Sequence, residues 1–102
     1  MTTTHLLYLH GFRSSPQSNK ARQMAARVQA EHPTVHWWCP QLPPSPRAAA
    51  ALIDEGTADW PAEYMAVVGS SLGGYYASWL AERRGCRAVL LNPAVDPARD
   101  LA

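Results

Sequence analysis

The sequence predicts an α/β fold in which a parallel four-stranded sheet carries helices on both faces. Short apolar runs alternate with longer stretches of helical periodicity in the order β-α-β-α-β-α-β, and each helical stretch is long enough to cross between parallel strands. Polar and apolar residues do not alternate along these runs, as they do in strands with one face exposed to solvent, so both faces of the sheet are expected to be covered. We expect a single domain over residues 1–102.

The predicted elements begin and end at residues with clear local preferences. The strands are apolar or β-branched runs over residues 5–10, 35–39, 64–68 and 87–91. Serine followed by proline predicts the first two helix starts, at Ser15 and Ser45, because serine caps an N-terminus and proline fits the first turn. The helices have apolar residues at intervals of three and four, and they cover residues 16–32, 46–55 and 72–84.

Composition and charge exclude several classes of protein. The formal net charge is +1, from nine Lys and Arg against eight Asp and Glu, so we expect no nucleic-acid partner. No apolar run approaches the roughly 20 residues that cross a bilayer, and residues 1–5 are too polar to open a signal peptide, so we expect a cytoplasmic protein without membrane contact. Cys39 and Cys86 stand too far apart for a paired zinc motif, so we expect buried, reduced thiols and no metal.

A Gly-x-Ser-x-Gly motif, formed by Gly69, Ser71 and Gly73, lies between the third predicted strand and the third predicted helix. A strand that reverses into a helix within two residues holds the central side chain on a strained turn. The positions two before and two after it then pass too close for a Cβ. This requirement selects Ser71 over Ser70, which would place valine and leucine at the crowded positions. Ser71 is therefore the candidate nucleophile.

A turn rich in glycine and serine can also be a plain turn or a phosphate-binding loop. A Walker loop requires a lysine and a dinucleotide-binding loop requires Gly-x-Gly-x-x-Gly, and this motif has neither. Its position, at the end of an apolar strand and the start of an amphipathic helix, favours the nucleophile interpretation.

A serine nucleophile needs two backbone N–H groups for the oxyanion that develops on its substrate. The first predicted strand ends at His10-Gly11-Phe12, and in a doubly wound sheet the carboxyl ends of the first and third strands adjoin. We therefore expect the N–H groups of Phe12 and Leu72 to form the oxyanion hole. His10 has two candidate roles, an anchor for its loop or a proton-transfer base, and its place in the chain favours the anchor.

Five segments form a pattern that runs nearly from end to end of the chain. They are His-Gly-Phe at residues 10–12, Ser-Ser-Pro at 14–16, Pro-Gln-Leu-Pro-Pro at 40–44, Gly-Ser-Ser-Leu-Gly-Gly-Tyr-Tyr at 69–76 and Asn-Pro-Ala-Val at 92–95. Together they resemble the YqiA-like esterases of the α/β-hydrolase superfamily. The resemblance implies that Ser71 is the nucleophile and that Phe12 and Leu72 form the oxyanion hole. It implies small acyl esters as substrates, including acyl-CoA thioesters, with no cofactor and no metal.

The chain departs from that family at the other two members of the catalytic triad. The family's members run to nearly twice this length, and their acid and histidine follow later strands in the order Ser, Asp, His. All four histidines here precede Ser71, and we interpret Asp96 and Asp100, after the last predicted strand, as loop residues. We therefore expect a truncated α/β-hydrolase fold with sheet order 2-1-3-4, whose acid and histidine lie beyond Ala102.

The sequence thus predicts a serine hydrolase, an esterase or thioesterase, that acts on small acyl esters. The alternative is a binding module or inactive relative that keeps the crevice without hydrolysis. The last strand, residues 87–91, would lie at the edge of the sheet although its composition is that of a buried central strand. We therefore also expect self-association through this strand.

Overall fold

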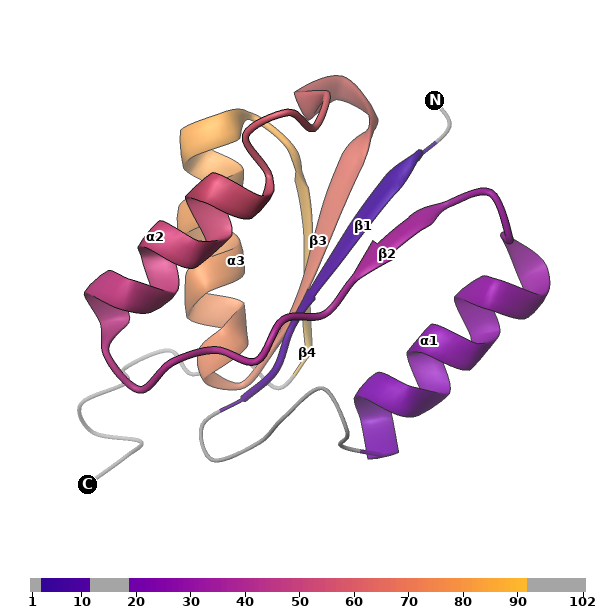
Figure 1. Ribbon diagram of the computed structural model, residues 1–102, viewed down its shortest axis with the longest axis horizontal. Coiled ribbons are helices and arrows are strands. Elements are labelled where there is room, and N and C mark those ends of the chain that lie inside the picture. Colours follow the sequence, from indigo (N-terminus) through magenta and orange to yellow (C-terminus); the bar gives the residue numbers. More distant parts are fainter. Residues whose placement is uncertain (1–2, 12–18, 92–102) are drawn as a thin grey trace.

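The chain folds into three layers, with a sheet between one helix on one face and two helices on the other (Figure 1). The computed structural model describes residues 3–11 and 19–91. The elements in chain order are β1 (His5–Leu9), α1 (Asn19–Glu31), β2 (His36–Trp38), α2 (Pro46–Gly56), the 3-10 turn η1 (Ala62–Tyr64), β3 (Met65–Ser70), α3 (Leu72–Arg84) and β4 (Arg87–Leu91). The predicted α/β class and the predicted alternation of strands and helices are confirmed.

All four strands are parallel, in the order β2-β1-β3-β4, which confirms the predicted order 2-1-3-4. β1 and β3 lie side by side in the centre, with Leu9 opposite Gly69 in register. Because these strands run in the same direction, their carboxyl ends meet at one edge of the sheet. The chain order reverses between them, and this switch point is where open α/β sheets bind their ligands.

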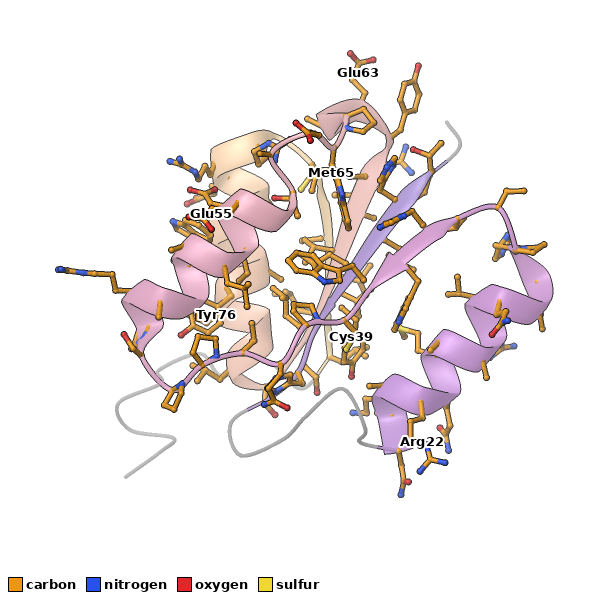
Figure 2. All side chains as sticks on the ribbon, viewed as in Figure 1. Arg22, Cys39, Glu55, Glu63, Met65 and Tyr76 are labelled. Carbon is orange, nitrogen blue, oxygen red and sulfur yellow. The ribbon has the colours of Figure 1, made fainter. Side chains whose placement is uncertain are left out.

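Two apolar cores hold the helices against the sheet. Successive residues of a strand point to opposite faces, so Leu7 and Leu9 pack toward α2 and α3 while Tyr8 packs toward α1. Tyr76 of α3 and Cys39, which follows β2, belong to these opposite cores (Figure 2). The larger core, on the side of α2 and α3, contains Leu7, Leu9, Ala49, Ile53, Trp60, Met65, Val67, Tyr76, Ala77 and Leu80.

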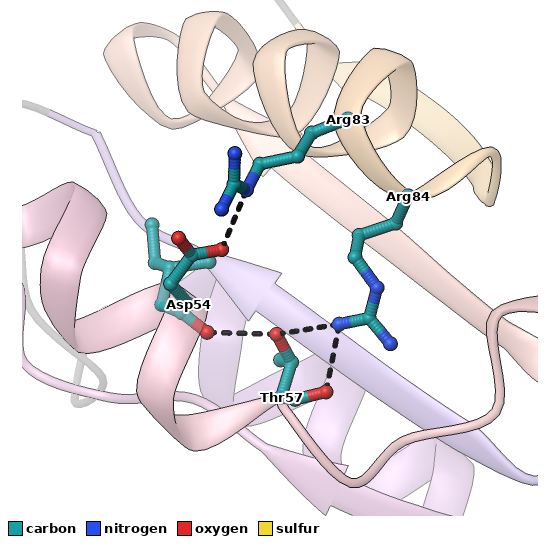
Figure 3. A network of polar contacts seen from close by, with 5 residues as sticks. Asp54, Thr57, Arg83 and Arg84 are labelled. Atoms are coloured by element: carbon teal, nitrogen blue, oxygen red, sulfur yellow. Dashed lines mark hydrogen bonds and ion pairs between the residues drawn. The ribbon is translucent and has the colours of Figure 1, made fainter.

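A network of polar contacts joins the ends of α2 and α3 (Figure 3). The guanidinium of Arg84 donates to the carbonyl oxygens of Thr57 at 2.8 Å and Trp60 at 2.6 Å. Arg83 Nε donates to Asp54 at 3.0 Å, in a pair that is partly exposed and therefore contributes little to stability. The contacts of Arg84 contribute more to stability, because they satisfy backbone carbonyls in the turn that carries the buried Trp60.

Helix boundaries agree with the sequence better than strand boundaries do. The hydroxyl of Ser45 accepts from the N–H of Ala48 at 3.3 Å as the predicted cap of α2, and α3 ends at Gly85 as predicted. The predicted start of α1, at residues 14–16, lies outside the described residues. β1 ends one residue early, β2 keeps three of its five predicted residues, and β3 begins and ends later than predicted. The late end of β3 arises because its last two residues pair with the end of β4.

The outer strand β4 lies at an edge of the sheet, as predicted. Val89 and Leu90 are 52% and 41% exposed, so the strand presents large apolar side chains on this edge. Cys39 and Cys86 are free thiols, but the prediction that they are buried is wrong, because both are half-buried. Among residues 3–11 and 19–91, none of the helices has the length and apolar character needed to cross a membrane.

Candidate active site

Ser71 lies at the junction between β3 and α3, at the carboxyl edge of the sheet. Its backbone has φ 53° and ψ −118°, and within the described ranges it is the one non-glycine residue with positive φ. Residues other than glycine adopt such a backbone conformation only under strain. Although Ser71 occupies the N-cap position of α3, its hydroxyl makes no capping hydrogen bond, and the residue is exposed. The fold therefore presents this hydroxyl to solvent.

The neighbouring Ser70 has a different environment. It is the last residue of β3, where it pairs with Leu91 of β4, and it is half-buried. Burial raises the pKa of the hydroxyl of Tyr8, a buried residue of β1, and the Ser70 side chain opposes the rise. Of the two adjacent serines, Ser70 thus belongs to the packing of the sheet, and Ser71 is the one that faces outward.

The glycines two residues before and after Ser71 occupy crowded positions. A Cβ on Gly69 would overlap the backbone carbonyl of Gly73. A Cβ on Gly73 would in turn overlap the backbone carbonyl of Leu9, at the end of β1. Because the overlapping atoms are backbone atoms, they cannot rotate away as a side chain can. Glycine is therefore the residue that lets β3 reverse into α3 this tightly.

The chain that follows β1 runs directly past the Ser71 hydroxyl. A Cβ on Gly11 would lie 3.0 Å from Ser71 Cβ and 3.5 Å from Ser71 Oγ. Phe12, one of the two predicted oxyanion donors, lies outside the described residues. Leu72, the other, is the first residue of α3, where N–H groups have no acceptor within the helix and the helix dipole favours negative charge. The structure thus brings Gly11, Ser71 and Leu72 together at one edge.

His10 is 5% exposed and uses both ring nitrogens in hydrogen bonds. Nε2 accepts from the backbone N–H of Leu42 at 2.8 Å, so Nδ1 carries the proton and donates to the carbonyl of Gly11 at 2.9 Å. These two bonds tie the loop after β2 to the loop after β1. His10 therefore anchors the loop beside Ser71 and has no free nitrogen with which to take the serine's proton.

The other three histidines lie away from Ser71. His5 and His36 pair in register at the amino-terminal ends of β1 and β2, the far end of the sheet. His32 is exposed and follows α1. Asp96 and Asp100 lie outside the described residues. Hence none of the four histidines of this chain is placed to act as a base for Ser71.

The two cysteines are weak candidates for a competing nucleophile. Burial raises the pKa of Cys39 to about 11 and also raises the pKa of Cys86 above its ordinary value. At neutral pH both are therefore protonated thiols, whereas the thiolate is the reactive form. Within the part of the chain that the structure describes, no group of three or more His, Cys, Asp or Glu residues is arranged to hold a metal ion.

A family model described as Uncharacterised protein family (UPF0227) matches residues 5–102 of the chain. The chain belongs to the UPF0227 family. This is the YqiA-like family indicated by the sequence motifs, so that resemblance is confirmed. The UPF0227 match includes β1, the Ser71 turn and β4, and thus every element that forms the carboxyl edge.

One contact at the candidate site of this UPF0227 chain carries no strong sequence signal. The N–H of Leu42 fixes the tautomer of His10, and through it the loop beside Ser71. The segment 40–44 is rich in proline, which signals a stiff connection, and Pro40 is buried. Stiffness alone does not tell which N–H meets the histidine, because that depends on how two loops from different strands meet.

Proposed function

We propose that this UPF0227 chain carries the nucleophile and oxyanion hole of a serine hydrolase, an esterase or thioesterase for small acyl esters. Ser71 Oγ adds to the acyl carbonyl, and the N–H groups of Leu72 and Phe12 stabilise the oxyanion. The intermediate then expels the alcohol or thiol with a proton and leaves acyl-Ser71, which water hydrolyses to the acid and free serine. The observation that carries this proposal is the strained, exposed Ser71 at the switch point of the sheet.

Activation of the serine requires a base within hydrogen-bond reach. His10 is occupied by two hydrogen bonds, and the other histidines lie away from Ser71. We therefore propose that the histidine and its acid partner come from outside these 102 residues. Removing members of a triad leaves a residual acceleration of roughly 10³ to 10⁴ over water, so the chain by itself should hydrolyse esters slowly.

The second candidate function is a binding module that keeps the crevice and performs no hydrolysis. The arrangement of the histidines favours it, because none of the four histidines is placed to take the proton of Ser71. The strain at Ser71 counts against it, because a binding module gains nothing from holding a serine at φ 53° without a capping bond.

Free imidazole can supply the missing base in a test on the chain itself. The assay follows nitrophenolate release from p-nitrophenyl acetate as imidazole is increased, with the chain, Ser71→Ala and the adjacent control Ser70→Ala. We expect the chain and Ser70→Ala to show an imidazole-dependent rate above that of imidazole alone, and Ser71→Ala to show none. Equal rates for all three proteins would overturn the proposal in favour of the binding module.

A further inference from the structure

Two histidines from neighbouring strands lie side by side at the end of the sheet opposite Ser71. His5 begins β1 and His36 begins β2, and the two residues are aligned in the parallel pair. Their ring centroids are 5.4 Å apart. Two imidazoles that share a tetrahedral zinc ion, with Zn–N distances of about 2.0–2.1 Å, place their ring centres roughly 5 Å apart. The pair already has the spacing of two ligands of one ion.

From this geometry we propose that His5 and His36 bind a divalent transition-metal ion of the zinc and copper class. Imidazole nitrogen suits these ions, whereas calcium and magnesium prefer oxygen ligands. Since no cluster of three or more His, Cys, Asp or Glu occurs among the described residues, the two imidazoles are the ligands that this part of the chain supplies. The site lies apart from Ser71 and is independent of the proposed hydrolysis.

A hydroxyl beside Nδ1 of His5 can leave the other ring nitrogen for a metal ion. Thr4 Oγ1 lies 2.8 Å from His5 Nδ1 and donates to the carbonyl of Tyr64 at 3.4 Å. When Nδ1 carries the ring proton it donates to this hydroxyl oxygen, and Nε2 keeps its lone pair. A partner of this kind on the second ring nitrogen is what fixes the tautomer of metal-binding histidines.

The indole of Trp60 orients both imidazoles. Its ring centroid is 5.0 Å from that of His5 and 5.6 Å from that of His36. Trp60 is itself buried, and its carbonyl is held by Arg84. The backbone N–H of His36 also donates to the carbonyl of Thr4 at 2.8 Å, which fixes the two strands at this level. Rings held in advance lose less conformational freedom when an ion binds.

Metal titrations of the untagged chain test this site. Cu²⁺ is followed by quenching of tryptophan fluorescence, since Trp60 contacts both rings, and Zn²⁺ by the ¹⁵N shifts of the imidazole nitrogens. The variants are His5→Gln and His36→Gln, with His32→Gln as a control at an exposed histidine elsewhere. We expect saturable quenching in the chain and in His32→Gln, at least tenfold weaker apparent affinity in the other two, and Zn²⁺-dependent shifts at the rings of His5 and His36.

The ring shifts are measured on the unaltered chain, so they keep the proposal testable if a variant folds poorly. Saturable shifts confined to His5 and His36 support the site. Absence of saturation, shifts at His32 equal to those of the pair, or equal copper affinity in all three variants would overturn it. In that case the two rings serve only to pack against Trp60.

Discussion

Replacing Ser71 with glycine should stabilise the chain while it removes the candidate nucleophile. The backbone at this residue has φ 53° and ψ −118°, which costs a side chain about 1–3 kcal/mol and which glycine adopts freely. Glycine in turn loses about 0.5–1 kcal/mol more conformational entropy on folding than alanine. The balance makes Ser71→Gly more stable than Ser71→Ala by about 1 kcal/mol, with an upper bound of about 2.5 kcal/mol. Both variants lack the hydroxyl, so its loss does not contribute to the difference in stability between Ser71→Gly and Ser71→Ala.

Urea unfolding followed by circular dichroism measures this difference, and a difference of about 1 kcal/mol corresponds to about 4–8 °C in Tm for a domain near this size. The matched control is the same pair of substitutions at Ser70, which lies in the extended strand β3. There Ser70→Gly should be less stable than Ser70→Ala. If glycine is also the less stable substitution at Ser71, the turn is not strained and the reasoning from its backbone is wrong.

Three further predictions concern the turn, the buried thiol and the edge strand. Gly73→Ala should lose at least about 2 kcal/mol of stability, because the added Cβ would overlap the carbonyl of Leu9. Gly85→Ala is the control: the added Cβ meets open space, and the loss should be only about 1 kcal/mol, from the φ of 71°. Equal losses for the two variants in thermal unfolding would count against the overlap at Gly73. The free energy of unfolding should fall between pH 9 and 11, because the folded chain keeps the Cys39 proton up to a pKa of about 11 while the unfolded thiol releases it from its ordinary value of 9.0. Cys39→Ala should make the free energy of unfolding depend less steeply on pH in this range, and an unchanged slope would contradict the assignment to Cys39. We also propose that two copies pair through β4, so light scattering should show an oligomer that Leu90→Lys converts to a monomer; a chain that stays monomeric at every concentration would refute the pairing.

The parts of this fold that follow from local chemistry could be predicted from the sequence. Ser45 caps α2, and Gly85 ends α3 with the left-handed φ that glycine tolerates. The crowding at Gly69 could be predicted for the same reason, since its Cβ would meet the backbone of Gly73 within the same turn. At Gly73 the requirement for glycine was also predicted, but the overlapping atoms there belong to Leu9 of β1.

The parts that depend on contacts between distant segments could not be predicted. β3 continues to Ser70 because this residue pairs with Leu91, more than twenty residues later along the chain. The sequence treats His5 and His36 as unrelated residues, and only the register of β1 against β2 places their rings together. Burial of Cys39 was overestimated because this residue directly follows β2, a strand at the edge of the sheet.

The most direct test of Ser71 as nucleophile is the site at which the chain becomes acylated. The chain is reacted briefly with p-nitrophenyl acetate in the presence of imidazole, digested, and mapped by fragment-ion mass spectrometry. Acetylation at Ser71, with Ser70 and the exposed Ser78 of α3 unmodified, is the predicted result. Acetyl groups on Ser70 or Ser78 to the same extent as on Ser71, or none on Ser71, would contradict it.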